Sequence, residues 1–434
     1  MPARGSSRTW WSAFITATLI ATVIVSSAPV SAASALPSVR HEHRDRKFLG
    51  IVPSRNTMLR AANTLQAPMP LQYHGGPVQH VSRDYAIFWA PPSYTFPVGY
   101  QQTIDQYLSD VAHDSYAPAN VYGAETQYYD ISRGVKRFAS YAVSFGGAVA
   151  DTHALPTNGC PNYKLYDGSK SSACLTDSQL EKEISAVIAG NGLPTGLGVE
   201  YFLFTPQSVA TCQTAQALAG GGCYDPLHYN GYCAYHSNIG LVAPFTLYAN
   251  MGFANLRGCT TGISPNANAA ADAVINIVSH EQNETMTDPL GNAWYDSNGN
   301  EGGDKCETSY GTILGNNGSD IFNQVINGHD YFLQGEWSNR ARDCVQRNTY
   351  PQPTVMFTWT PSAPQHGTPV AFSSAVADLS SSKFAYLWSF GDLGASAQAN
   401  PTHTFAVTGT RVVTLLVTDS YGDQTRIVDD VTVI

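Results

Sequence analysis

The hydrophobic and polar positions of this chain follow two textures, and the change between them predicts two domains. From about residue 71 to 347, apolar runs of strand length are mixed with segments of helical spacing; the runs include 84–90 (DYAIFWA), 198–205 and 240–248. Strands that are buried on both faces have such continuous apolar runs. From about residue 355 only short alternating strands remain. We therefore expect an α+β domain over 71–347, a linker at 348–354 and an all-β domain over 355–434.

Three segments of the first domain have helical spacing. One is centred on residues 104–111. The second begins at Thr176, which makes a capping box with Gln179, and we expect it to end near Gly190. The third begins near Ser264-Pro265 and runs to Asp288, because the proline that follows cannot continue a helix.

The third predicted helix contains the candidate functional side chains. Its apolar stripe continues into Glu281, Glu284 and Asp288, and His280 lies at the edge of that stripe. Charged groups on a buried face cost free energy unless they are paired or bind a cation. The pattern therefore predicts either a bound metal ion or a structural cluster of hydrogen-bonded side chains.

The motif His280-Glu281-x-x-Glu284 favours zinc. It resembles H-E-x-x-H, in which two residues one helical turn apart bind Zn²⁺ and the glutamate acts as general base. His280 and Glu284 would bind the metal here, and Glu281 would be catalytic. A third ligand is expected about 20 residues later, which leaves Glu301 and Asp304 as alternatives.

Two other interpretations of neighbouring residues remain open. The Asp/Asn/Gly-rich loop 296–307 offers oxygen ligands for Ca²⁺, although its glycine is misplaced for an EF-hand. Asp225, His228 and His236 lie near cysteines and could be further ligands, but we expect ordinary loop residues. Asp288 is expected to support His280 or the end of the helix.

The ends of the chain and its net charge indicate where the protein acts and which partners it does not bind. Arg4 and Arg8 precede an apolar stretch at 10–25 and A-x-A-like cleavage sites, which predicts a signal peptide at 1–35. Residues 36–70 would be a linker or a short pro-segment. The net charge of −10 argues against a nucleic-acid partner. We expect a secreted, monomeric protein with no stable membrane anchor after the signal is removed.

All 8 cysteines lie between Cys160 and Cys344, and no CxxC pair occurs. In an exported protein this number predicts up to four disulfides rather than zinc–thiolate sites. The spacing alone leaves the pairing open.

The C-terminal domain resembles the PKD (polycystic kidney disease) family. The resemblance rests on WSFGD at 388–392, PTHTF at 401–405 and VTLLV at 413–417. It implies an immunoglobulin-like β-sandwich with Trp388 in the core and a turn at Gly391-Asp392. It also implies a role as a spacer or a polymer-binding accessory.

The main domain resembles the Exordium/phosphate-induced protein 1 family of plant cell walls and secreted bacterial proteins. The resemblance is carried by residues 277–295 (IVSHEQNETMTDPLGNAWY), 301–306 (EGGDKC) and 327–333 (NGHDYFL). The activity of that family is poorly defined. The His-Glu pair that is retained here favours a working site.

Together these observations predict a zincin-like α+β domain followed by a PKD sandwich. The first functional hypothesis is a secreted zinc-dependent hydrolase, a metallopeptidase in particular, that acts on extracellular protein or a wall polymer. The alternative is a non-catalytic extracellular protein that binds the cell wall or another polymer. A third hypothesis is an adhesion module stabilised by Ca²⁺.

Overall fold

The computed structural model describes residues 69–157, 159–160, 173–215, 222–224, 231–255 and 258–434, together with the backbone of 49–53. The predicted signal peptide, most of the 36–70 segment, Asp225 and His228 lie outside the described residues. The predicted domain boundaries stay predictions.

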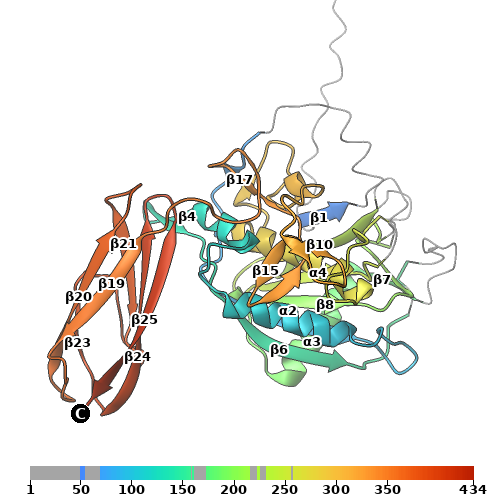
Figure 1. The fold of residues 1–434 in the computed structure, drawn as a ribbon. Helices are drawn as coiled ribbons and strands as arrows, with labels where there is room; N and C mark the ends of the chain where they lie inside the picture. The colour runs from blue at the N-terminus through green and yellow to red at the C-terminus, as the bar shows by residue number, and fades with distance from the viewer. Residues whose placement is uncertain are drawn as a thin grey trace, which may run out of the picture. The chain divides into compact units, whose positions relative to one another are not determined.

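A six-stranded mixed sheet forms the centre of the main domain (Figure 1), in the order β1-β10-β11-β8-β3-β6. Its strands are β1 (Leu49–Pro53), β3 (Ser82–Trp89), β6 (Val143–Asp151), β8 (Gly196–Phe204), β10 (Tyr232–Ile239) and β11 (Thr246–Met251). The pairs β3–β6, β3–β8 and β8–β11 are parallel, whereas β10 is antiparallel to both of its neighbours. The single reversed strand, β10, thus lies between β1 and the parallel strands.

The structure refines the α+β expectation into a mixed α/β domain with a largely parallel sheet. The apolar runs predicted at 84–90 and 198–205 are the parallel strands β3 and β8, which are buried along most of their length. The predicted run at 240–248 is only partly right, because its first half is a turn and β11 begins at Thr246. Short hairpins such as β4–β5 (Tyr129–Ser132 and Val135–Phe138) interrupt the β-α-β alternation. The alternation therefore cannot be recognised in the sequence pattern.

In the part of the chain that the structure describes, three α-helices accompany the sheet: α2 (Tyr100–His113), α3 (Asp177–Asn191) and α4 (Ala269–Thr287). The predicted capping box of Thr176 and Gln179 is present at the start of α3. The predicted end of α3 is two residues early: the helix is capped by Gly192 in the left-handed conformation. Helix α4 contacts α2, β10 and β11, and α2 contacts β3 and β6.

Smaller elements surround this core and carry several site residues. The 3-10 helices are η1 (Val121–Gln127) and η3 (Asp304–Cys306). The remaining short strands of the main domain are β2 (Gln72–Tyr73), β7 (Ala173–Thr176), β9 (Val209–Cys212), β12 (Trp294–Tyr295), β13 (Gly315–Asn316), β14 (Ile321–Phe322), β15 (Gln324–Ile326), β16 (His329–Tyr331), β17 (Glu336–Ser338) and β18 (Asp343–Val345).

All eight cysteines form disulfides, as predicted. The pairs are Cys160–Cys174, Cys212–Cys223, Cys233–Cys259 and Cys306–Cys344. Such pairing is typical of proteins that fold in an oxidising, extracellular compartment. Among the described helices, none has the length and apolar character needed to cross a bilayer.

The C-terminal residues fold as an all-β sandwich with its own core. One sheet contains β19 (Thr354–Thr360), β20 (Pro369–Ala377) and β23 (Thr402–Thr404); the other contains β21 (Phe384–Ser389), β22 (Ala395–Ser396), β24 (Gly409–Asp419) and β25 (Gln424–Val433). Trp388 is fully buried between them and packs against Phe357 and Phe372. Gly391 has a φ of 73°, as the predicted turn requires.

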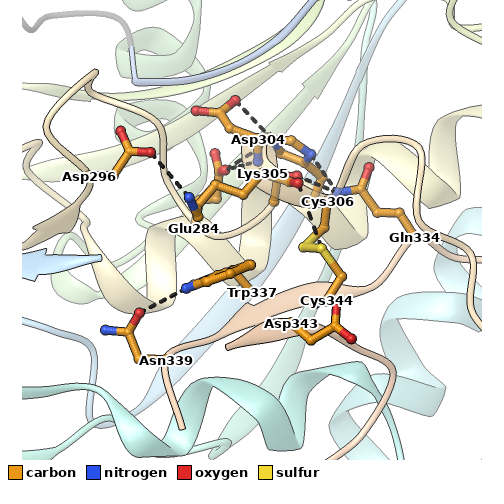
Figure 2. Close-up of a disulfide and its surroundings, with 12 residues drawn as sticks. Glu284, Asp296, Asp304, Lys305, Cys306, Gln334, Trp337, Asn339, Asp343 and Cys344 are labelled. Atoms are coloured by element: carbon orange, nitrogen blue, oxygen red, sulfur yellow. Dashed lines mark hydrogen bonds and ion pairs between the residues drawn. A yellow bond between two sulfur atoms is a disulfide. The ribbon is translucent and has the colours of Figure 1, made fainter. Parts of the chain in front are cut away.

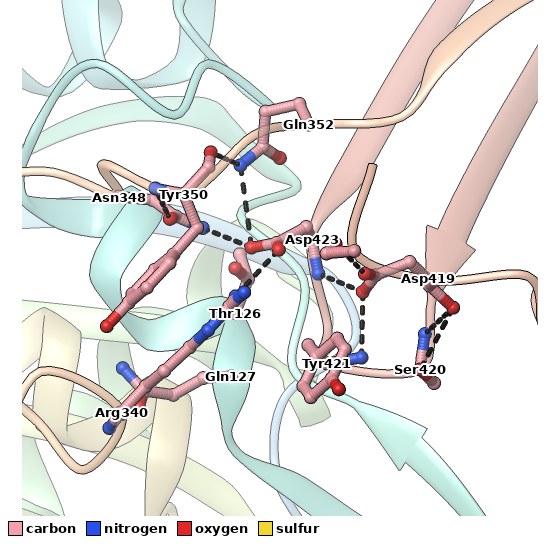
Figure 3. Close-up of polar contacts among 12 residues, drawn as sticks. Thr126, Gln127, Arg340, Asn348, Tyr350, Gln352, Asp419, Ser420, Tyr421 and Asp423 are labelled. Carbon is pink, nitrogen blue, oxygen red and sulfur yellow. Dashed lines mark hydrogen bonds and ion pairs between the residues drawn. The ribbon is translucent and has the colours of Figure 1, made fainter. Parts of the chain in front are cut away.

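The turn between β24 and β25 contacts main-domain residues through Asp423 (Figure 3). Arg340 Nη1 lies 2.7 Å from Asp423 Oδ2, and Asn348 Nδ2 donates to Asp423 Oδ1 at 2.7 Å. Asp423 is almost completely buried, so these two donors satisfy a carboxylate that would be costly to leave unpaired.

Candidate metal centre

Helix α4 holds the residues of the motif deep in the main domain. Asn268 caps the helix by accepting a hydrogen bond from the Ala271 amide at 3.2 Å. The predicted start near Ser264 is early, because Ser264 instead donates to Asp272 in the first turn of the helix. Every residue from Ala270 to Thr287 is buried, so His280, Glu281 and Glu284 all lie in the interior.

Three of the predicted ligands come together at one point. His280 Nε2 lies 3.2 Å from Glu284 Oε1 and 3.8 Å from Asp304 Oδ1. The Asp304 amide donates to Glu284 Oε1 at 2.9 Å (Figure 2), which fixes η3 against the helix. One ligand atom from each of His280, Glu284 and Asp304 lies within 4.8 Å of the others, so this group could hold a metal ion.

His236, which we expected to be an ordinary loop residue, is part of the same centre. It lies on strand β10 and is 1% exposed. Its Nε2 lies 3.2 Å from Glu301 Oε2 and 3.8 Å from Glu284 Oε2. His236, Glu281 and Glu284 form a second group whose ligand atoms lie within 4.8 Å of one another. Of the two alternatives for the third ligand, Asp304 thus joins His280 and Glu284, whereas Glu301 lies beside His236.

Several polar atoms of this centre lack a hydrogen-bond partner. They include His236 Nδ1, Glu284 Oε2 and the carboxylate oxygens of Glu281, which accept no hydrogen bond from a side chain, whereas His280 Nε2 has Glu284 Oε1 at 3.2 Å. Buried polar atoms are nearly always satisfied in native proteins, and each exception needs an explanation. A cation at the shared point would satisfy the atoms that face it.

Gly303 and Gln334 hold the His280 ring from its other side. A Cβ atom on Gly303 would lie 2.8 Å from the ring, so only glycine allows this approach. Gln334 Nε2 donates to the Gly303 carbonyl oxygen at 2.9 Å and lies 3.0 Å from His280 Nδ1. In this orientation the amide nitrogen also donates to Nδ1, and the ring proton is on Nε2, toward Glu284.

The position of that proton matters for metal binding. A ring that coordinates a metal through Nε2 carries its proton on Nδ1 and donates it to an acceptor. Gln334 must then present its amide oxygen, not its nitrogen, to His280. The residues therefore fit a metal ion, on condition that this one amide turns.

The pKa values of the acidic side chains in the centre are shifted from their usual range. Burial raises the pKa of Glu281 well above its usual range, and the carboxylates of Glu284 and Asp304 add to the shift. Burial likewise raises the pKa of Asp304 to about 8. Glu284 is the exception: burial alone would raise its pKa, but His280 and His236 outweigh this and lower it. Glu284 is thus the carboxylate that stays charged.

The pKa values of the two histidines are shifted in opposite directions. Burial lowers the pKa of His236 to about 4, so its ring is neutral at physiological pH. Burial also acts to lower the pKa of His280, but the Glu284 carboxylate outweighs it and the pKa is raised. A neutral imidazole is the form that binds metals, which His236 provides without further change.

Asp288 supports the end of the helix, one of its two predicted roles, whereas the loop 296–307 is held by protein donors. Asp288 Oδ1 accepts hydrogen bonds from the amides of Asn292 and Ala293, so it shapes the turn after α4. In the loop 296–307, Asp296 accepts from two loop amides and pairs with Lys305 at 3.2 Å. Its oxygens are therefore already occupied by protein donors.

The fold and the buried His/Glu groups define a class: a mixed α/β domain with a potential metal centre on one helix, followed by an all-β sandwich. Residues 350–433 match the family described as "PKD domain". The chain is also 23% identical over 310 residues to "Protein EXORDIUM-like 3" of Arabidopsis thaliana, a match that covers 64% of this chain and 83% of the relative. The chain is thus a distant Exordium-like homologue over most of its length, with a C-terminal PKD domain.

Solved structures of β-sandwich and PKD domains match about a fifth of the chain. The PKD1 domain of the Vibrio cholerae metalloprotease PrtV is 29% identical over 19% of this chain and 98% of its own length, with a TM-score of 0.18. A structure of carbohydrate-binding modules from the beta-sandwich superfamily is 29% identical over 19% of this chain, with a TM-score of 0.18. This chain spans 34% of the length of that second protein.

Proposed function

We propose that this chain is a secreted zinc-dependent hydrolase of the zincin type, in which His280, Glu284 and Asp304 would hold the metal ion and leave one position for water, with His236 beside Glu284. The observation that supports the proposal is the set of carboxylate oxygens on Glu281 and Glu284 without side-chain partners, in two groups whose ligand atoms each lie within 4.8 Å of one another. Imidazole and carboxylate groups are among the donors that zinc takes in proteins.

Glu281 is the proposed general base. Bound zinc would supply a water of lowered pKa as the nucleophile. No side chain donates a hydrogen bond to Glu281, which has the backbone of His236 as a neighbour, so the carboxylate is available to accept a proton. The raised pKa of Glu281, which burial causes, favours its protonated form in the metal-free protein. A nearby divalent cation would lower that pKa, which makes the function of Glu281 depend on the metal.

The proposed substrate is an extracellular protein or a wall polymer, and a peptide bond is the first bond to test. The PKD domain would act as an accessory that spaces or holds the substrate. The four disulfides and the predicted signal peptide support a site of action outside the cell.

The test combines metal analysis with two variants of the full mature chain. We expect about one zinc per chain, hydrolysis of a casein or wall-polymer substrate, and loss of that activity on chelation. Glu281→Gln should keep the zinc and lose the activity, whereas His280→Ala should lose both. Activity that survives in Glu281→Gln with zinc still bound would rule out Glu281 as the base.

The complete burial of the centre favours a second candidate function, a non-catalytic extracellular protein that binds a polymer. His280, Glu281 and Glu284 are each 0% exposed, and the outer edge of β10 beside His236 is paired with β1. A catalytic metal needs an open position for water and substrate. If the protein binds zinc and pulls down with wall polymer but cleaves nothing, this second function replaces the first.

A further inference from the structure

A second group of buried acids lies beside the candidate metal centre and has no role in the proposed hydrolysis. Glu125 belongs to η1 and Glu336 to β17, two elements that contact each other. Both side chains are 0% exposed. We refer to Glu125 and Glu336 as the acidic pair.

All four carboxylate oxygens of the acidic pair lack a hydrogen-bond partner. No ion pair to either residue is present in the described part of the chain. Burying a carboxyl group without any partner costs several kcal/mol, and two in one place cost more. Such a pair persists in a folded protein only when something else satisfies its oxygens.

The two side chains converge on the backbone of Gly302. A Cβ atom placed on Gly302 would lie 3.2 Å from Glu336 Oε2 and 3.8 Å from Glu125 Oε2. These two oxygens are therefore no more than about 7 Å apart, by the sum of those distances. A cation with oxygen ligands at 2.3–2.6 Å bridges oxygens up to about 5 Å apart, a spacing that lies within this upper limit. The missing side chain of Gly302 leaves the space that such an ion needs.

Protonation alone does not explain the arrangement. Burial raises the pKa of Glu125, and the charge of Glu284 adds to this; burial and then the charge of Glu125 raise that of Glu336. A protonated acid, however, still has a hydroxyl to donate and an oxygen to satisfy, and neither residue has a partner for them. The only ligand atoms of the pair are carboxylate oxygens, with neither imidazole nor thiolate.

We propose that Glu125 and Glu336 hold a second cation, Ca²⁺, beside the candidate zinc centre. Oxygen-only donors select a hard cation such as Ca²⁺, whereas the two histidines of the neighbouring centre select zinc. The ion bridges η1 and β17 and balances carboxylates that face toward Glu284. The proposal stands without the hydrolase, because it needs only the acidic pair.

The test measures calcium and zinc separately on the full mature chain. Chelator-treated protein is dialysed against Ca²⁺ alone and then against Zn²⁺ alone, and the bound metal is counted. We expect one Ca²⁺ per chain in the wild type and in His280→Ala, and none in the double variant Glu125→Gln/Glu336→Gln. The double variant should still bind its zinc. Because glutamine has the shape of glutamate but no charge, the variant should fold.

Gly302→Ala provides a second route if the double variant does not fold. It keeps both carboxylates but fills the space between them, so Ca²⁺ binding should weaken at least tenfold. Terbium, which replaces Ca²⁺, should emit after excitation of the adjacent Trp337 at a concentration at least tenfold lower in the wild type than in Gly302→Ala. Wild-type protein that binds no Ca²⁺, or a double variant that binds as much as the wild type, would overturn the proposal whatever happens to zinc.

Discussion

The Cys306–Cys344 disulfide should be needed for the metal centre as well as for stability. It joins the end of η3 to β18, so it holds Asp304, two residues earlier, against Glu284 (Figure 2). The perturbation we consider is the double variant Cys306→Ala/Cys344→Ala. The matched control is Cys160→Ala/Cys174→Ala, which removes a disulfide that packs in a separate cluster with Cys212 and Cys223.

The expected loss of stability follows from the length of the loop that each disulfide closes. The separation of 38 residues between Cys306 and Cys344 corresponds to about 4 kcal/mol of unfolded-state entropy. The separation of 14 residues between Cys160 and Cys174 corresponds to about 3 kcal/mol. Urea unfolding should therefore show similar losses for the two variants, with a difference of about 1 kcal/mol.

Zinc affinity should separate the two variants where stability does not. Without the disulfide, η3 is free to move and Asp304 is no longer fixed beside Glu284. Loss of such support typically costs about 10- to 100-fold in metal affinity. We expect this loss in the Cys306/Cys344 variant and none in the control, measured by competition with a zinc indicator. Equal losses in both variants, or none in either, would refute the link between this disulfide and the site.

Three further predictions test separate parts of the structure. Burial raises the pKa of Asp84 to about 7, above its unfolded value of 3.8, so its contribution to stability is complete below about pH 4 and is lost as the pH rises through 7. Urea unfolding at pH 5 and 8 should show a fall of up to about 3 kcal/mol from this residue, which Asp84→Asn removes. Gln334→Glu should tighten zinc binding about tenfold by giving His280 Nδ1 an acceptor, and Gln334→Met should weaken it, by the same indicator assay. Trp388→Ala should destabilise the PKD domain by about 3–5 kcal/mol in calorimetry and leave the zinc content unchanged.

The parts of the site that one helix carries could be predicted from the sequence. The spacing of His280 and Glu284 is a local property of α4, and Asp304 follows within one loop. His236 could not be found in this way, because its place in the site depends on β10 lying against α4. The only local signal was a histidine inside the strand-like run YCAYHSNI at 232–239.

The fold shows the same division between local and long-range information. The capping box of α3, the strand β3 and the sandwich core around Trp388 follow from short patterns. The strand order of the main sheet does not, because parallel neighbours such as β3 and β6 are far apart in the chain. Glu125 and Glu336 had no signal at all, since a single glutamate in an aromatic-rich segment is usually at the surface.

The charge balance around Glu284 connects the proposals. Two imidazoles, those of His236 and His280, face a larger set of interacting carboxyl groups: Glu125, Glu281, Glu284, Glu301, Asp304, Glu307 and Glu336. Without metal, the site can remain buried only if most of these acids are protonated, and in that state Glu281 cannot accept a proton. Each bound cation allows further carboxylates to ionise. Under the proposals above, the metal content would therefore decide whether Glu281 can accept a proton.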